Sequence, residues 1–233
     1  TRAGASTLAE LSIMNTPFIA VPLPFSKDNH QFENARYYEQ NDCCWIIEQS
    51  ALEANIEEVL KNSNITVNKL SAIAVSSGPG SYTGLRIGVS AAKGLCYALQ
   101  IPLISVPTLQ VLARQLNIQR EDLIIPVMDA RRDEVYSAVY NSEYELVRDI
   151  FPEIIDSESF SGLAKDNKLY FIGNGQEKCE RLIRKNSNLI FSNYDTFPSS
   201  KEMVLISYEK FKKSKFEDVA YFEPDYLKKF KAG

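Results

Sequence analysis

A strand, a glycine-rich turn and a long apolar helix follow one another in residues 70–99, and this stretch limits the fold more than any other. The apolar run 70–75 predicts a strand, and Gly78, Pro79 and Gly80 predict a tight turn after it. The segment that follows, 84–99, is apolar over most of its helical circumference. Such a helix must be covered on more than one side, by its own sheet and by a second element of this chain or another.

Small and polar residues divide the surface of this helix. Four polar residues recur at helical spacing and form one narrow stripe. They are Arg86, Ser90, Lys93 and Tyr97. Gly84, Gly88 and the pair Ala91 and Ala92 leave room for a second element to approach closely. We therefore expect one side of the helix to be a contact surface.

The glycine turn has two interpretations. Backbone N–H groups at a glycine-rich helix start can hold a phosphate, which makes Gly78, Gly80 and Ser81 candidate anion or nucleotide ligands. The Walker pattern, however, requires a Lys-Ser/Thr pair after its last glycine, and here Gly84 is followed by leucine. We favour the alternative, a tight turn in which Ser81 or Thr83 caps the helix.

The same residues resemble the signature of a known family. Ser76-Ser-Gly-Pro-Gly-Ser-Tyr-Thr-Gly-Leu-Arg-Ile-Gly, with Ala92-Lys-Gly-Leu after it, is similar to the signature of the TsaB (YeaZ) family of tRNA threonylcarbamoyladenosine biosynthesis. The resemblance extends from about residue 51 to the C-terminus. It implies the two-lobed α/β fold of actin-like ATPases (ASKHA, ribonuclease H-like). Residues 51–104 would be the remainder of lobe I, and residues 105–233 would be lobe II with a C-terminal helix and tail.

The resemblance also implies a function. Members are noncatalytic partner subunits that dimerise with the catalytic TsaD protein and support N6-threonylcarbamoyladenosine (t6A) modification at position 37 of ANN-decoding tRNAs. A cytoplasmic location, tRNA contact only through the complex, and further partnership with a TsaE-like ATPase or a second copy are expected. No cofactor is predicted for the chain itself, although ATP can act through the complex. The implied interface residues are Ile56, Leu60, Gly84, Ile87, Gly88, Ala91 and Leu95.

Several residue types needed for chemistry are scarce. His30 is the single histidine, so the TsaB-like body has no imidazole for a Ser-His-Asp or Cys-His arrangement or for histidine metal ligation. We therefore predict no catalytic residue and no metal site.

The net charge of −4 argues against a chain that binds nucleic acid by itself. The 4 cysteines form no CxxC pair, which predicts reduced, buried thiols. No apolar run approaches the length of a membrane span.

Two further places are candidate nucleotide contacts. A predicted strand at 169–172 ends in Gly173, Asn174 and Gly175, and in actin-like ATPases a glycine turn at this place can approach adenosine. Alternatively, both glycines supply the positive φ of a turn. Asp129 ends the predicted strand 123–128 and opens a charged turn, 129–134. We interpret that turn as mutually neutralised surface charge, with Asp129 as the residue able to face a cleft between lobes.

Residues 1–50 have a different character. Arg2-Ala-Gly-Ala-Ser-Thr-Leu-Ala-Glu, Pro17-Phe-Ile-Ala-Val-Pro and Asp28-Asn-His-Gln-Phe-Glu-Asn-Ala resemble the C-terminal domain of MurG, the peptidoglycan N-acetylglucosaminyltransferase. By that resemblance Glu10 matches a carboxylate that binds the uridine ribose and Gln31 a residue near the sugar. The alternative is that both are solvated helix residues. Strands at 18–21 and 43–47 and helices at 6–14 and 29–39 suit a parallel arrangement.

This leader does not match the strands that begin the TsaB family. We therefore expect an incomplete first lobe preceded by a foreign α/β leader. Because the chain opens at Thr1, we expect its natural start to be missing or removed. Two alternative functions follow: a remnant UDP-N-acetylglucosamine transferase fragment, or an inert truncated fold. Further helices are predicted at 51–61, 108–116, 157–164, 177–183 and 200–213, and further strands at 101–106 and 135–140.

Overall fold

The computed structural model describes residues 18–20, 44–46, 58–191 and 197–228. The chain divides into two compact units, Thr1–Leu70 and Ser71–Gly233. Our division at residues 50 and 104 follows the family resemblance and stays a prediction. The predicted helices 6–14 and 29–39, together with Glu10, Gln31 and Ile56, lie outside the described residues.

Two short strands are described in the first unit. β1 (Phe18–Ala20) and β2 (Cys44–Ile46) pair in parallel, with Phe18 opposite Cys44, so both strand predictions and the parallel arrangement are confirmed. Residues 58–62 are helical, as predicted for the end of the helix 51–61. A 3-10 turn, η2 (Val67–Lys69), precedes the second unit.

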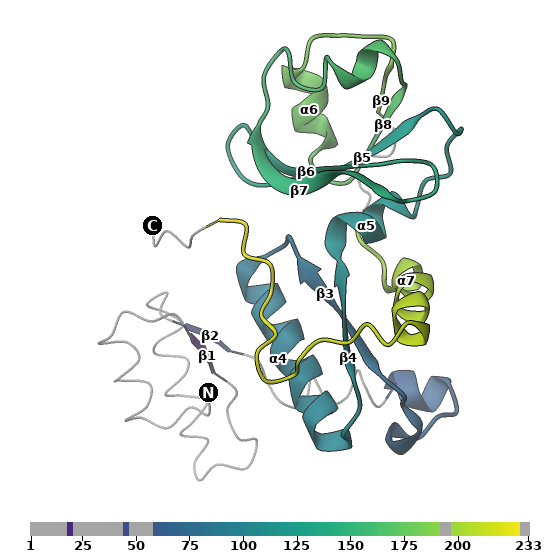
Figure 1. Ribbon diagram of the computed structural model, residues 1–233. Helices are drawn as coiled ribbons and strands as arrows, with labels where there is room; N and C mark the ends of the chain where they lie inside the picture. Colours follow the sequence, from purple (N-terminus) through teal and green to yellow (C-terminus); the bar gives the residue numbers. More distant parts are fainter. Residues whose placement is uncertain (1–17, 21–43, 47–57, 192–196, 229–233) are drawn as a thin grey trace. The chain divides into compact units, whose positions relative to one another are not determined.

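One half of the second unit is a two-stranded parallel sheet between two helices. β3 (Ile73–Gly78) pairs with β4 (Leu103–Pro107), and α4 (Tyr82–Leu99) connects them. Cys96 of α4 packs with Leu103 on one face, whereas Ile206 of α7 (Ser200–Lys212) packs with Val106 on the other. Figure 1 shows α4 and α7 flanking this sheet. Among the described residues no further strand pairs with β3, which agrees with the expected incomplete lobe I.

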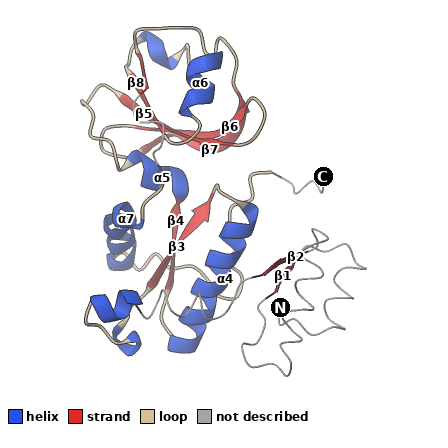
Figure 2. Cartoon of the chain, turned by 180° about the vertical axis from the view of Figure 1, so that it is seen from behind, coloured by secondary structure: helices blue, strands red, loops and turns tan. Residues whose placement is uncertain are grey.

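The other half is a five-stranded sheet in the order β7-β6-β5-β8-β9. β5, β6 and β7 form an antiparallel meander, and β8 and β9 extend it in parallel. The bounds are β5 (Leu123–Asp129), β6 (Glu134–Tyr140), β7 (Leu146–Ile154), β8 (Leu169–Ile172) and β9 (Leu189–Phe191). The sheet follows the β3–β4 half through α5 (Thr108–Ala113), as Figure 2 shows from behind.

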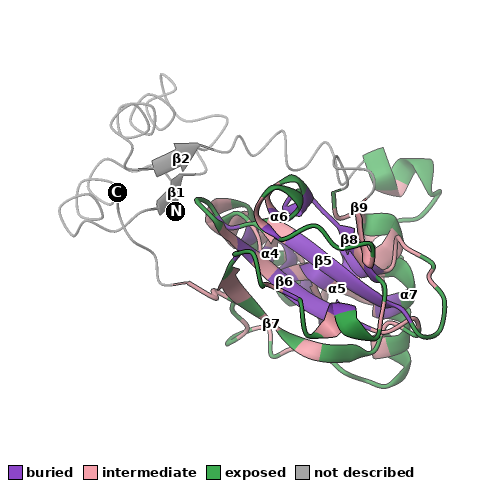
Figure 3. Ribbon diagram, turned by 90° about the horizontal axis from the view of Figure 1, so that it is seen from above, coloured by how far each residue is buried: buried purple, intermediate pink, exposed green. Residues whose placement is uncertain are grey.

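Both faces of this sheet are covered, because residues of β5 alternate between two cores. Ile124 packs with Leu109 and Leu112 of α5 on one face. Ile125 and Val127 pack on the other face against α6 (Gln176–Leu182) and the 3-10 turn η3 (Leu163–Lys165). Figure 3 shows the buried strands β5, β6 and β8 in purple. The predicted strand at 123–128 is thus confirmed as β5, which is buried on both faces.

The predicted helix at 157–164 is wrong. Turns precede η3 in this segment. Ser159 Oγ accepts a hydrogen bond from the amide of Asp156 at 3.0 Å, and the Asp156 carboxylate accepts one from the amide of Glu158 at 3.0 Å. These local bonds give the backbone an alternative to helical hydrogen bonding.

Candidate functional site

The glycine turn positions the start of α4. Gly78 has φ 118°, a conformation that favours glycine, and the chain then turns through Pro79 and Gly80. Ser81 is the residue before the helix, and its Oγ accepts a hydrogen bond from the amide of Gly84 at 3.3 Å. Of the two predicted caps, Ser81 therefore serves this role. This local bond fixes where the helix begins.

The buried face of α4 lies against its own sheet. It consists of Leu85, Val89, Ala92 and Cys96, which recur at i, i+4, i+7 and i+11. A second row of residues lies one position before each of these four. We call this second row, together with Ile87, the outer stripe. The outer stripe is Gly84, Ile87, Gly88, Ala91 and Leu95, of which Gly84 is exposed and the others half-buried. Small residues thus leave this side of α4 partly open, next to its buried face.

The C-terminal segment covers a different side of α4. Lys93 Nζ donates hydrogen bonds to the backbone carbonyls of Ala220 at 3.1 Å and Phe222 at 2.9 Å. Phe222 packs with Cys96 and Ala92 in the core of this half. The helix is therefore covered on two sides by its own chain, as its composition predicted. The polar stripe meets the tail through Lys93, whereas Tyr97 stays 76% exposed.

No specific role for Lys93 was predicted from the sequence. A lysine within a mostly apolar helix indicates a specific contact, because its ammonium group needs several oxygen acceptors. In this structure those acceptors are backbone carbonyls far along the chain. Nothing in the local sequence around Lys93 identifies them.

Leu60, the remaining predicted interface residue that is described, lies in the first unit. It belongs to the helical residues 58–62 and is half-buried, whereas its neighbour Val59 is 64% exposed. The whole predicted interface set stays a prediction.

The two glycines after β8 are required by packing against β5. A Cβ on Gly173, which has φ 110°, would lie 2.3 Å from the carbonyl oxygen of Val127. A Cβ on Gly175 would lie 3.2 Å from backbone and side-chain atoms of the same valine. Only Gly173 needs a positive φ, because Gly175 has φ −87°. Packing thus explains both glycines, and their contact with a nucleotide stays a prediction.

The charged turn after β5 is neutralised from outside the turn. Asp129 Oδ1 lies 3.1 Å from Lys178 Nζ of α6 and accepts a hydrogen bond from the amide of Arg131 at 2.6 Å. Arg181 pairs with Asp133 at 3.5 Å, and Lys228 pairs with Glu134. The turn residues therefore use partners from α6 and the tail, rather than each other as we expected. The role of Asp129 as a nucleotide contact stays a prediction.

Cys96 and Cys179 are free and buried, which confirms the expectation of reduced, buried thiols for these two cysteines. Burial raises the pKa of Cys179 from 9.0 to about 12, with a further rise from the carboxylate of Glu153. A thiol with this pKa carries its proton at neutral pH and is a poor nucleophile.

Within the part of the chain that the structure describes, no group of His, Cys, Asp and Glu is arranged to hold a metal ion. No described helix is long and apolar enough to cross a membrane.

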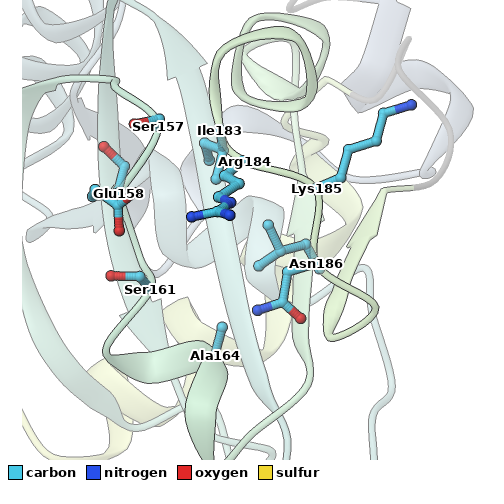
Figure 4. Close-up of a pocket in the computed structure, with 10 residues that line it drawn as sticks. Ser157, Glu158, Ser161, Ala164, Ile183, Arg184, Lys185 and Asn186 are labelled. Carbon is cyan, nitrogen blue, oxygen red and sulfur yellow. The ribbon is translucent and has the colours of Figure 1, made fainter.

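A small pocket lies between the 157–164 turns and the loop after α6. Its volume is about 190 Å³, and Figure 4 shows the side chain of Arg184 on the wall opposite Glu158 and Ser161. Buried Ala164 and Ile183 line its apolar part, whereas the labelled charged residues are exposed. None of the residues singled out by the sequence lines this pocket. Exposed charges on a rim give weak and unspecific electrostatics, so we assign no chemistry to it.

Two family models match the chain. One, described as TsaD, tRNA N6-adenosine threonylcarbamoyltransferase, matches residues 49–232. The other, the C-terminal domain of glycosyltransferase family 28, matches residues 1–77. The two matches divide the chain much as the two resemblances did.

Similar proteins repeat this division. The tRNA threonylcarbamoyladenosine biosynthesis protein TsaB of Bacillus subtilis is 31% identical over 179 residues, covering 74% of this chain and 76% of that protein. TsaB of Escherichia coli is 28% identical over 188 residues, covering 74% of this chain and 77% of that protein. The UDP-N-acetylglucosamine transferase acting on pyrophosphoryl-undecaprenol in Pelagibacter ubique is 49% identical over 67 residues, which cover 29% of this chain and 18% of that enzyme.

Solved structures show the same fold. A Pseudomonas aeruginosa protein described as uncharacterized, with similarity to peptidase YEAZ, aligns with TM-score 0.68 at 23% identity, over 77% of this chain and 84% of that one. YeaZ from Pseudomonas aeruginosa aligns with TM-score 0.62 over 74% of this chain and 80% of that one. The fold and the family match thus define a two-lobed α/β protein of the actin-like ATPase class. The chain belongs to the TsaB (YeaZ) family, and its N-terminal segment is similar to a MurG-type transferase domain.

Proposed function

We propose that this chain takes part in t6A biosynthesis as a noncatalytic subunit that binds a TsaD-type catalytic protein through α4. The observation that carries the proposal is the outer stripe. It presents Gly84 and Ala91 on a partly open side of α4, next to Gly88, where an added Cβ would lie 3.8 Å from Val75 of β3. Rows of small residues let two helix backbones approach closely, as a partner helix requires.

The chemistry of the described residues supports a noncatalytic role. The TsaB-like body contains no imidazole, because His30 is the single histidine of the chain. The Cys179 thiol is kept protonated by burial, and the Asp129 carboxylate is engaged by Lys178. A subunit of this kind contributes surface and positioning rather than a reacting group. Its contact with tRNA and with ATP would then be made through the complex.

Other partners follow from the same proposal. A TsaE-like ATPase would join the assembly through the catalytic subunit. In the absence of the catalytic subunit, two copies of this chain can pair through the outer stripe, since a twofold axis places the same small-residue surface on both sides of the contact. A homodimer would then compete with the heterodimer for α4.

The test is a binding measurement with a matched pair of variants. The full chain is titrated calorimetrically with the TsaD-type protein of the same organism. Ala91→Arg places a long side chain on the outer stripe and is expected to weaken binding by about 100-fold or more. Ser90→Arg adds the same group one residue earlier, on an exposed side of α4, and is expected to bind as the unmodified chain does.

Folding is checked by thermal melting of each variant alone. Ile87→Asp provides a second disruption of the outer stripe, with the same expected loss of binding. Equal binding by Ala91→Arg, Ile87→Asp and the unmodified chain would refute the placement of the interface. No binding by the unmodified chain would favour the inert fold.

The N-terminal match supports a second candidate, a remnant nucleotide-sugar site. The identity of 49% over 67 residues is its basis, but the segment spans 18% of the similar enzyme. Glu10 and Gln31 would contact the ribose and sugar. Calorimetric titration with UDP-N-acetylglucosamine tests this candidate, and we expect no binding heat. Binding that Glu10→Gln removes would instead support the remnant site.

A further inference from the structure

The segment after α7 runs without regular secondary structure along the β3–β4 half. We call residues 217–228 the strap. Its first residue forms an antiparallel bridge with β4, where the amide of Glu217 donates to the carbonyl of Leu103 at 2.9 Å. The Glu217 carboxylate accepts a hydrogen bond from Ser105 Oγ, and Lys210 Nζ donates to the carbonyl of Ser105 at 2.7 Å. This end of the strap is therefore fixed to β4.

The middle of the strap lies on α4. Lys93 holds two of its backbone carbonyls, those of Ala220 and Phe222, while the Phe222 side chain enters the core. Figure 1 shows the yellow segment running beside α4, and Figure 2 shows the same course from behind. Tyr221, between the two clamped residues, is 84% exposed. The strap is thus held by its backbone and by alternate side chains.

The far end of the strap touches both halves of the second unit. The amide of Asp225 donates to the carbonyl of Ser77 at 2.7 Å, beside the glycine turn. A Cβ on Gly78 would lie 3.0 Å from the carbonyl oxygen of Asp225. Three residues later, Lys228 Nζ donates to the carbonyl of Ala130 at 2.9 Å and pairs with Glu134, in the β5–β6 turn. The strap covers Gly78 and then crosses to the five-stranded half.

We propose that residues 217–228 form a releasable strap that joins the β3–β4 half of the second unit to the β5–β6 turn and covers the glycine turn. Its contacts are the bridge at Leu103, the Lys93 clamp, the packing of Phe222, the Asp225–Ser77 hydrogen bond and the Lys228 contact. The two lysine contacts are made to backbone carbonyls and one carboxylate by partly exposed side chains, so they can open locally, together with the partly buried Phe222 side chain. Opening would expose the Ser77–Gly78 backbone, while α5 would still join the two halves through Val111 in one core and Leu109 in the other.

The strap also decides which ligands can reach the glycine turn. With Asp225 seated against Gly78, a phosphate-bearing ligand would meet the backbone carbonyl and the exposed carboxylate of Asp225 at this place. Like charges oppose its approach. This inference is independent of any partner bound at α4.

Hydrogen exchange on the full chain tests the strap. Two amides report on it. That of Asp225 belongs to the strap and is bonded to the carbonyl of Ser77, and that of Ala130 is bonded to the carbonyl of Glu134 in the turn that Lys228 contacts. Lys93→Met removes the clamp on α4, and Lys228→Met removes the contact with the β5–β6 turn. Lys213→Met, at the end of α7, is the control, because its side chain is exposed and takes part in none of these contacts.

The expected result is coupling between the two ends. Lys228→Met should raise the exchange rate of the Asp225 amide by about tenfold, and Lys93→Met should raise that of the Ala130 amide, while circular dichroism stays unchanged. Lys213→Met should change neither rate. Changes confined to the residues next to each substitution would overturn the proposal, as would an Asp225 amide that exchanges at the rate of an unprotected peptide in the unmodified chain.

Discussion

The rings of Tyr82 and Tyr226 lie with their centroids 4.6 Å apart and their planes tilted by 36°. Tyr82 is the first residue of α4, and Tyr226 is near the end of the strap. The guanidinium of Arg86, one turn along α4, lies 4.7 Å from the centre of the Tyr82 ring. Burial raises the pKa of Tyr226, which is consistent with a ring seated against the body. This pair therefore joins the start of the helix to the end of the strap.

We expect Tyr82 and Tyr226 to be energetically coupled. A double-mutant cycle with Tyr82→Ala and Tyr226→Ala should give a coupling free energy of about 1 kcal/mol, since close aromatic pairs contribute this much beyond their buried area. Urea unfolding of the four proteins measures it. A coupling energy of zero within error would mean that the two rings are neighbours without mutual stabilisation.

Gly173→Ala should destabilise the protein strongly. The added methyl group would meet the Val127 carbonyl at 2.3 Å, and φ 110° is unfavourable for alanine. Strain of both kinds gives a loss of about 3 kcal/mol or more in the free energy of unfolding. Gly162→Ala is the control, because a Cβ there meets nothing within 4 Å and φ is −64°. Equal stability of the two variants would contradict this account of Gly173.

Lys178 and Arg181 both form ion pairs with the β5–β6 turn, but their removal should lower the free energy of unfolding by different amounts. The Lys178 side chain is 9% exposed, donates to the Glu134 carbonyl at 2.8 Å and contacts Asp129. Lys178→Met should therefore lower the free energy of unfolding by about 2 kcal/mol, through lost hydrogen bonds in a buried place. Arg181 and Asp133 are more than half exposed, so Arg181→Met should cost about 0.5 kcal/mol or less. Chemical denaturation of both variants gives the comparison, and a reversed order would count against it.

Alkaline pH should destabilise the fold through Cys179. Its pKa is 9.0 in ordinary surroundings and about 12 in the folded chain, so above pH 9 the unfolded state loses the thiol proton first. Fewer bound protons in the unfolded state mean that stability falls as pH rises, by at most about 1.4 kcal/mol per pH unit for one group. Stability is thus full below pH 9 and declines toward pH 12.

Burial also raises the pKa of Tyr140, which adds to the decline at higher pH. The test is equilibrium unfolding of the unmodified chain and of Cys179→Ala between pH 8 and 11, a range set by these pKa values. It shows which group causes the fall of the free energy of unfolding with pH. The variant should lose stability less steeply. Parallel profiles would assign the alkaline loss to other groups.

Much of the fold could be predicted from local sequence patterns. The apolar run 123–128 became β5, and the glycine turns before α4 and α6 lie where the sequence placed them. β7 was not predicted, because most of its residues are exposed or half-buried and it carries Arg148, Glu153 and Pro152. Its strand conformation depends on pairing with β6, a tertiary contact that no local pattern shows. The three-residue β9 is equally dependent on β8.

The surface of α4 and its contacts could be predicted only in part. The periodicity of α4 predicted one buried face and one polar stripe, and both are present. Its spacing did not show that Lys93 would hold the tail, since Ala220 and Phe222 are distant in sequence. Likewise Gly78 was interpreted from turn geometry, whereas the structure adds the close approach of Asp225. Long-range partners of this kind are set by topology.

The place of β5 in its sheet has a consequence for how the protein folds. On one side it pairs with β6 across a short turn, and on the other with β8, which is far along the chain. During synthesis the hairpin can form early, whereas β8 must close a long loop before it gains any pairing. We therefore expect docking of β8 beside Val127, where Gly173 permits the close approach, to be the late and rate-limiting event in this half of the molecule.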